Sequence, residues 1–280
     1  MYKRLQKASE ALSQNQNVIK LVQEIRYEQP FIGTEKIYGL IKKDLENMNI
    51  KIGRIKLNSI LKEHGMLVRK KKKSVITTNS RHRFRKYPNL IKEIEISQAE
   101  QVWVADITYI RTNDGFNYLH LITDAYSKRI VGFELSNNLK AESTINALKM
   151  ALKGRKYPDR KLTHHSDRGL QYCSDDYVQI LIENDIEISM TENSDPYENA
   201  IAERVNGILK QEFSIGDGFK NHLMALHEIK KSIYIYNNKR PHRSCEMLTP
   251  EKAHLNGKYK LPSYAFITKP KNELSLKNNS

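Results

Sequence analysis

Apolar side chains recur three or four residues apart in two early stretches: Ile37, Leu40, Ile41 and Leu45, then Leu57, Ile60 and Leu61. This spacing predicts two amphipathic helices, and Gly65 is placed to end the second one. The segment "NMNIKIG" joins the two helices, an arrangement compatible with a helix-turn-helix unit. Arg54, Lys56 and Lys62 lie on the polar side of the second helix and favour contact with nucleic acid.

The pattern changes near residue 100, where β-branched and aromatic residues dominate "QVWVADITYI", "FNYLHLITDAY" and "RIVGFELS". The turn signal "TNDG" joins the first two stretches, so we expect three antiparallel neighbouring strands. Helical and strand-like stretches then alternate: "AESTINALKMALKG", "LTHHSD", "DDYVQILIEND", "IEISM", a helix within 198–213, and "HLMALHEIKKSIYIYNN". This order predicts an α/β fold with a mixed sheet and helices packed on it.

Charge divides the chain into three parts. The net charge is +12 over residues 1–100, −4 over 101–207 and +7 over 208–280, which together give the chain's +15. Residues 69–86 carry nine Lys or Arg and no acid, which is typical of a linker that contacts nucleic acid. Basic flanks around an acidic centre suggest a polyanion held by the flanks and cations held by the centre.

Two aspartates lie within a predicted strand or directly after one. Asp106 lies within "VWVADITYI", where a charge is costly unless it is paired or binds metal. Asp167 follows the strand "LTHH", and ligands tend to collect at strand ends in α/β sheets. A water-facing Asp106 and a turn-forming Asp167 are the structural alternatives.

A third acid comes from "SDPYENAIAERVNGILKQE". A helix over 198–213 would bury Ile201, Val205, Ile208 and Leu209, and would place on another face Asn199, Glu203, Asn206 and Lys210. Glu203 then has the surroundings of a metal ligand near a phosphate backbone. Asp195 and Glu198 suit the helix start, and Glu212 suits pairing with a base.

These residues and the sequences around them resemble a known family. Asp106, Asp167 and Glu203, with 35 residues between the last two, resemble the D,D-35-E pattern of the retroviral-integrase superfamily. The flanking sequences are similar to the integrase core of bacterial insertion-sequence transposases encoded in two overlapping frames: "WVADITYI", "HHSDRGLQY", "ENAIAERVNGILKQE" and "YNNKRPHRSCEMLTPEKAH". The chain resembles their second-frame product, OrfB, over about residues 30–255.

The resemblance implies a ribonuclease-H-like core, a mixed five-stranded sheet flanked by helices, after a small helix-turn-helix-like domain. We expect a helical domain at 1–68, a basic linker at 69–98, the catalytic core at 99–255 and a tail at 256–280. The resemblance implies a polynucleotidyl transferase that cleaves DNA and transfers strands with two Mg²⁺ or Mn²⁺ ions, and it assigns the catalytic and metal-binding roles to Asp106, Asp167 and Glu203. No zinc is expected.

DNA contacts are expected at Lys210, which matches the family's residue for element-end DNA, and at Arg54, Lys56, Arg69, Lys70, Lys71, Asn199 and Asn206. The expected partners are double-stranded DNA of the element's terminal inverted repeats and of the target, the first-frame OrfA product or a fusion with it, and further copies of the chain on DNA. No signal-peptide-like start or membrane-spanning stretch is seen, and we expect a cytoplasmic, nucleoid-associated bacterial protein with reduced cysteines at 173 and 245.

The chain departs from the family pattern beside the site, at Glu198 and at Arg204-Val205, without loss of a carboxylate ligand. Two other functions stay open at this point: an inactive DNA-binding regulator, and a structure-selective nuclease of the same fold. His165 suits either orientation of a ligand or packing at a strand end. Arg240 and His242 are weaker candidates for DNA contact.

Overall fold

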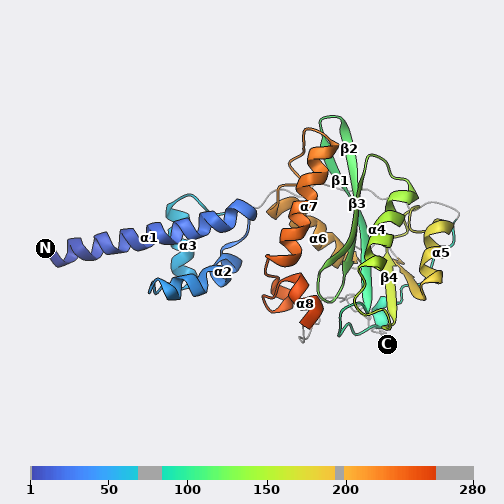
Figure 1. Ribbon diagram of the computed structural model, residues 1–280, viewed down its shortest axis with the longest axis horizontal. Coiled ribbons are helices and arrows are strands. Elements are labelled where there is room, and N and C mark those ends of the chain that lie inside the picture. Colours follow the sequence, from blue (N-terminus) through green and yellow to red (C-terminus); the bar gives the residue numbers. More distant parts are fainter. Residues whose placement is uncertain (1, 69–83, 193–198, 257–280) are drawn as a thin grey trace, which may run out of the picture.

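The computed structural model describes residues 2–68, 84–192 and 199–256. Figure 1 shows a helical domain at the N-terminal end and a larger α/β core beside it. Within these described residues, no helix is both long and apolar enough to cross a membrane.

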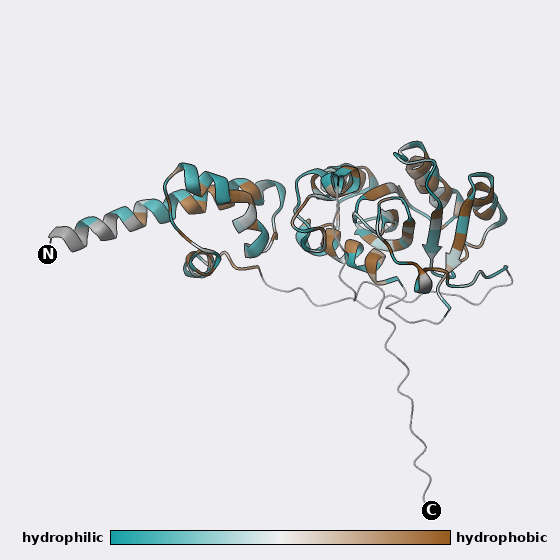
Figure 2. Cartoon of the chain, turned by 90° about the horizontal axis from the view of Figure 1, so that it is seen from below, coloured by the Kyte–Doolittle hydropathy of each residue, from teal (hydrophilic) through white to brown (hydrophobic). Residues whose placement is uncertain are grey.

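The helical domain consists of α1 (Tyr2–Glu28), α2 (Thr34–Asn47) and α3 (Arg54–Glu63). Its core is formed by apolar side chains from all three helices, among them Val18, Val22, Ile37, Ile41, Leu57 and Ile60. The two amphipathic helices expected from the sequence are therefore confirmed, and α2 and α3 carry both hydrophilic and hydrophobic positions along their length (Figure 2). Gly65 adopts a positive φ of 65°, which suits a residue just past a helix end.

The core is built on five strands: β1 (Val102–Thr112), β2 (Gly115–Asp124), β3 (Ile130–Ser136), β4 (Leu162–Ser166) and β5 (Ile186–Met190). Their order across the sheet is β3-β2-β1-β4-β5. The first three strands pair antiparallel as expected, and β4 and β5 run parallel to β1. The predicted mixed five-stranded sheet is confirmed.

Helices cover both faces of this sheet (Figure 1). One face packs against α4 (Ala141–Lys153) and α5 (Asp175–Glu183), and the other against α6 (Ala200–Glu212), α7 (His222–Asn238) and α8 (Pro250–Asn256). Short 3₁₀ turns lie at Ile91–Glu93 and Arg243–Cys245. Gly132 on β3 permits the close approach of α4, because a Cβ there would lie 2.2 Å from the carbonyl oxygen of Ala147.

The C-terminal part of the expected linker packs on the core. Ile91 and Ile96 are buried with residues of β1, and the Pro88 carbonyl accepts a hydrogen bond from Met190 on β5 at 3.1 Å. The segment just before residue 99 thus contributes to the interior, whereas the division of the chain into domains stays a prediction. Both cysteines are free and buried.

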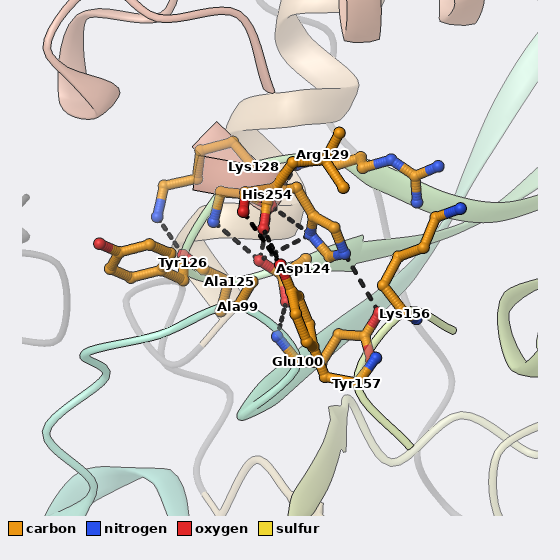
Figure 3. Close-up of polar contacts among 12 residues, drawn as sticks. Ala99, Glu100, Asp124, Ala125, Tyr126, Lys128, Arg129, Lys156, Tyr157 and His254 are labelled. Carbon is orange, nitrogen blue, oxygen red and sulfur yellow. Dashed lines mark hydrogen bonds and ion pairs between the residues drawn. The ribbon is translucent and has the colours of Figure 1, made fainter. Parts of the chain in front are cut away.

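A buried polar cluster joins the start of β1, the end of β2 and α8 (Figure 3). His254 lies between two carboxylates, with Nε2 3.1 Å from Glu100 Oε1 and Nδ1 3.7 Å from Asp124 Oδ1. Backbone amides of Lys156 and Tyr157 donate to Glu100 at 2.7 and 2.9 Å. Each carboxylate is therefore compensated by a cation and by amide donors.

The pKa values of this cluster follow from the pairing. Burial would raise the pKa of Glu100 and of Asp124, but the hydrogen bonds and charge of His254 outweigh it and hold both below their ordinary values. Burial would lower the pKa of His254, and its two carboxylate partners raise it instead. The ion pairing thus favours the charged forms of all three side chains.

Replacing His254 with Gln should lower the free energy of unfolding by roughly 3–5 kcal/mol near pH 6, because the two buried carboxylates would lose the cation that lies between them. The stabilisation by a histidine of raised pKa is complete below about pH 6.5 and is lost as pH rises through the folded pKa, so the difference from wild type should narrow toward pH 9. Urea denaturation at pH 6 and pH 9 measures both values. His227→Gln, on an exposed part of α7, is the matched control; an equal difference at both pH values would contradict the ion pairing.

Candidate functional site

Asp106 lies in the middle strand of the sheet and faces α6. Its Oδ2 accepts a hydrogen bond from Asn206 Nδ2 at 2.7 Å, and its Oδ1 accepts one from the Ile107 amide at 2.9 Å. The side chain is half-buried rather than turned to water. Asp106 is thus a strand carboxylate held by a helix side chain, as a preorganised ligand requires.

Asp167 directly follows β4, next to Asp106. The parallel register pairs Val104 with His165, and two further residues along each strand would set Asp106 opposite Asp167. Asp167 also forms a local turn, because its Oδ1 accepts a hydrogen bond from the Gly169 amide at 2.9 Å. The expected turn role and a position at the strand end therefore coexist in this residue.

Glu203 lies in the first turn of α6 and is exposed. The opposite side of α6 is buried against the sheet through the apolar residues expected from the sequence: Ile201, Val205, Ile208 and Leu209. The helix begins at Ala200 with Asn199 as its N-cap, and the expected burial of its apolar side is confirmed.

Electrostatics indicate that these three carboxylates lie close together. Burial, the charge of Asp167 and, to a smaller extent, the charge of Glu203 raise the pKa of Asp106 to about 7. The hydrogen bonds from Asn206 and Ile107 act in the opposite direction. Like charges gathered in a partly buried place favour either a proton or a cation there.

The two asparagines of this face are buried. Asn199 Nδ2 donates to the Ala105 carbonyl at 3.1 Å, and Asn206 holds Asp106. The side-chain oxygen Oδ1 of each asparagine has no hydrogen-bond partner among the described residues. These side chains fix β1 and Asp106 against α6, and the expected contact with DNA stays a prediction.

Lys210 lies two turns beyond Glu203 on α6. Burial lowers the pKa of its ammonium group, and the charge of Asp106 acts to raise it. Its stem packs against the loop after α6, where a Cβ on Gly216 would lie 3.2 Å from Lys210 Cβ. The lysine is therefore a half-buried cation within electrostatic reach of the acidic cluster.

The donor set fits a hard divalent cation, since the clustered acids are carboxylates. Within residues 2–68, 84–192 and 199–256, however, no three His, Cys, Asp or Glu side chains are already arranged as a metal-ligand group. A cation would have to draw the carboxylates of Asp106, Asp167 and Glu203 toward one another. The side chain of Glu203 is exposed in the first turn of α6.

The other expected residues have diverse environments. Arg54 and Lys56 are exposed on α3, and Arg54 Nη1 lies 3.6 Å from Glu35 Oε1. Outside the described residues lie Arg69, Lys70, Lys71, Asp195 and Glu198. His165 is buried, and its Nδ1 lies 2.8 Å from Ser189 Oγ, which supports the packing alternative.

Two side chains that follow the end of α7 are engaged inside the protein. Arg240 is buried and binds Glu212 with two nitrogens, and His242 is buried with Nδ1 2.9 Å from Ser244 Oγ. The expected pairing of Glu212 with a base is confirmed. Arg240 and His242 are not on the surface where they could reach DNA.

Sequence reasoning missed Tyr172. It is buried, its hydroxyl has no hydrogen-bond partner among the described residues, and its ring packs edge-to-face on Tyr177 with centroids 5.6 Å apart. Burial raises the pKa of this hydroxyl most, and the charges of Asp167 and Asp106 raise it further. The residue therefore lies beside the acidic cluster. The signal was its place five residues after Asp167 in "HHSDRGLQY".

Comparisons with known proteins identify the domain that contains these residues. Two family models, each described as an integrase core domain, match residues 97–196 and 184–250. The chain is 36% identical over 223 residues to the insertion element IS600 uncharacterized 31 kDa protein of Shigella sonnei, covering 78% of this chain and 82% of that protein. It is 31% identical to the transposase for insertion sequence element IS629 of Shigella sonnei, covering 73% of this chain and 69% of the relative.

Further similarity extends to other proteins. Transposase InsF for insertion sequence IS3A of Escherichia coli (strain K12) is 36% identical over 58% of this chain and 56% of its own. Among solved structures, the HTLV-2 integrase catalytic core domain in complex with magnesium has a TM-score of 0.45 and 19% identity, over 56% of this chain and 97% of that one. The simian T-cell lymphotropic virus intasome in complex with a PP2A regulatory subunit has a TM-score of 0.49 and 17% identity, over 85% and 79%.

Replacing Asp106 with Asn should stabilise the metal-free protein at alkaline pH. A carboxyl whose pKa is raised to about 7 destabilises the folded state increasingly as pH rises from about 4 to 7, and by a constant amount above that. We expect a gain of about 1–3 kcal/mol in unfolding free energy at pH 8 and less at pH 5. Urea denaturation in EDTA measures it, with exposed Asp114→Asn as the control. A loss of stability at pH 8 would contradict the uncompensated charge.

Proposed function

The chain belongs to the IS3 family of insertion-sequence transposases, whose members carry an integrase core domain, and we propose that it cuts DNA at the ends of an insertion element and joins those ends to target DNA. The observation that carries the proposal is the gathering of Asp106 with Asp167 and Glu203, where burial first and then the charges of the other two acids raise the pKa of Asp106 to about 7. Such a cluster, in a core of this family, suits metal-dependent phosphoryl transfer.

In this proposal the three carboxylates hold two divalent cations, Mg²⁺ or Mn²⁺. These ions supply the Lewis acidity that activates the attacking oxygen and stabilises the leaving oxygen of a phosphodiester. The same site acts twice, first with water as the attacking group and then with the freed 3′-hydroxyl, and no side chain becomes covalently attached to DNA. The protein contributes position and charge.

Neighbouring side chains support these carboxylates. Asn206 holds Asp106 Oδ2 toward α6, and Asn199 fixes the adjoining carbonyl of β1, so that the strand and helix ligands keep their relative position. Asp106 would hold such a cation in its deprotonated form and, with a pKa near 7, would give up its proton to do so. Lys210 is placed to meet a DNA phosphate next to the acidic cluster.

The helical domain is proposed to hold the element end. Arg54 and Lys56 project from α3 into solvent, as side chains of a recognition helix would. The basic stretch that follows, with Arg69, Lys70 and Lys71, adds charge for the phosphate backbone. We include among the proposed partners the first-frame product or a fusion with it, and further copies of this chain assembled on DNA.

Asp106→Asn, Asp167→Asn and Glu203→Gln should each reduce cleavage and strand transfer by at least about 1,000-fold, because each removes one charged ligand from the cation site. Binding to element-end DNA should change by less than about 3-fold, since the helical domain is untouched. The measurement uses purified protein, labelled element-end DNA and Mg²⁺, with exposed Glu183→Gln on α5 as the control.

The same assay on wild-type protein separates the three functions. Joined product supports the transposase, cleavage without joining would indicate the structure-selective nuclease, and binding without cleavage would indicate the regulator. A site variant that keeps its rate would overturn the assignment of that residue.

Arg54→Gln and Lys56→Gln should each weaken binding to element-end DNA by about 3- to 10-fold and reduce the slope of log K against log salt by about 1. The physical reason is the loss of one neutralised phosphate contact. Fluorescence anisotropy over a series of salt concentrations measures both quantities. Lys149→Gln on α4, across the sheet, removes the same charge and should leave the salt slope unchanged.

A further inference from the structure

The last residue of α6, Glu212, is the centre of a polar junction between the two parts of the chain. Its carboxylate accepts hydrogen bonds from Arg240 Nε and Nη2, both at 2.8 Å, and from Lys36 Nζ at 3.0 Å. Its backbone carbonyl accepts a further hydrogen bond from the amide of Phe31 at 3.2 Å. We call these four residues the Glu212 junction.

The junction is mostly shielded from water. The exposed fractions of the side chains are 14% for Glu212, 2% for Arg240 and 18% for Lys36. Burial acts to raise the pKa of Glu212, but the hydrogen bonds and charges of Arg240 and Lys36 outweigh it and lower the pKa. A bidentate arginine with a second cation fixes direction as well as distance, unlike an exposed ion pair.

The three partners come from different elements. Lys36 lies in α2 and Phe31 just before it, both in the helical domain, whereas Arg240 follows α7 in the core. In Figure 1, α7 is the core helix that faces the helical domain. A second contact joins the domains where Lys239 Nζ lies 2.6 Å from Glu28 Oε1, but that pair is exposed and contributes less.

The same helix carries the junction and part of the catalytic cluster. Glu203 lies nine residues before Glu212 on α6, a distance of about 13–14 Å along a rigid helix. Lys210 lies between them, two residues before the junction. The helical domain is thus attached to the helix that presents a catalytic carboxylate, rather than to a remote part of the core.

We propose that the Glu212 junction sets the position of the DNA-holding helical domain relative to the catalytic carboxylates, with Lys36 as its positioning residue. DNA bound by α3 then reaches the carboxylates at one fixed distance, and a single phosphodiester is cut. This inference rests on the proposed function for its catalytic readout. Its structural content, the docking of the helical domain through Lys36, can be measured without DNA.

Lys36 is the informative position to change, because its replacement removes only one of the side-chain contacts of Glu212. In Lys36→Met the Glu212–Arg240 pair remains inside the core, so α6 and α7 keep their connection while the helical domain loses its charged contact with Glu212. The apolar stem, which covers part of the interface, is retained. Lys36→Arg preserves the charge and serves as the conservative variant, and Lys43→Met on the exposed side of α2 is the matched control.

The test measures single-turnover cleavage of element-end DNA already bound to full-length protein. For Lys36→Met we expect DNA affinity within about 2-fold of wild type, a cleavage rate lower by about 10-fold or more, and cuts spread over neighbouring phosphodiesters. Lys36→Arg should recover most of the rate and the single cut, and Lys43→Met should behave as wild type. Without DNA, small-angle X-ray scattering should show a larger radius of gyration for Lys36→Met alone.

Two results would overturn the proposal. One is a Lys36→Met variant with an unchanged cleavage position and rate. The other is a variant whose cleavage rate falls together with its thermal stability while the same phosphodiester is still cut. If wild-type protein cuts no DNA, the proposed function fails, and the scattering result still decides whether Lys36 docks the helical domain. An unchanged radius of gyration would reject that docking role.

Discussion

Carboxylates inside the sheet must be compensated, and the fold meets this constraint in two opposite ways. Glu100 and Asp124 have His254 and backbone amides as partners, which hold their pKa values low. Asp106, one strand away from Asp124, is gathered with Asp167 and Glu203, and its pKa rises to about 7. The two carboxylates paired with His254 stabilise the core, whereas the group of three around Asp106 leaves a place for a cation.

The geometry of the acidic cluster follows from strand register. Asp106 and Asp167 are brought together because β1 and β4 run parallel and adjacent, although 60 residues separate them in the chain. Glu203 comes from α6, which reaches the same face of the sheet through its apolar side and the amide of Asn206. Because α6 ends at Glu212, one helix connects this cluster with the helical domain.

Periodicity predicted the strands, the amphipathic α2 and α3 and the buried side of α6, because local spacing determines which side chains face the interior. It also separated Glu203 from Glu212, since the two lie on different sides of one helix. It could not find the partner of Arg240, a weak candidate for DNA contact in the sequence, because Glu212 lies 28 residues away in the chain. Nor could it identify Tyr172, whose importance depends on burial and on the neighbouring charges.

The place of His254 in the chain bears on synthesis. The two carboxylates that it compensates, Glu100 before β1 and Asp124 at the end of β2, lie 130 or more residues earlier, so a nascent chain holds them without this histidine until α8 emerges. A product that stops short of α8 would lack the cation that lies between them and would be more prone to degradation. The core therefore reaches its full stability only after the whole catalytic region has been translated.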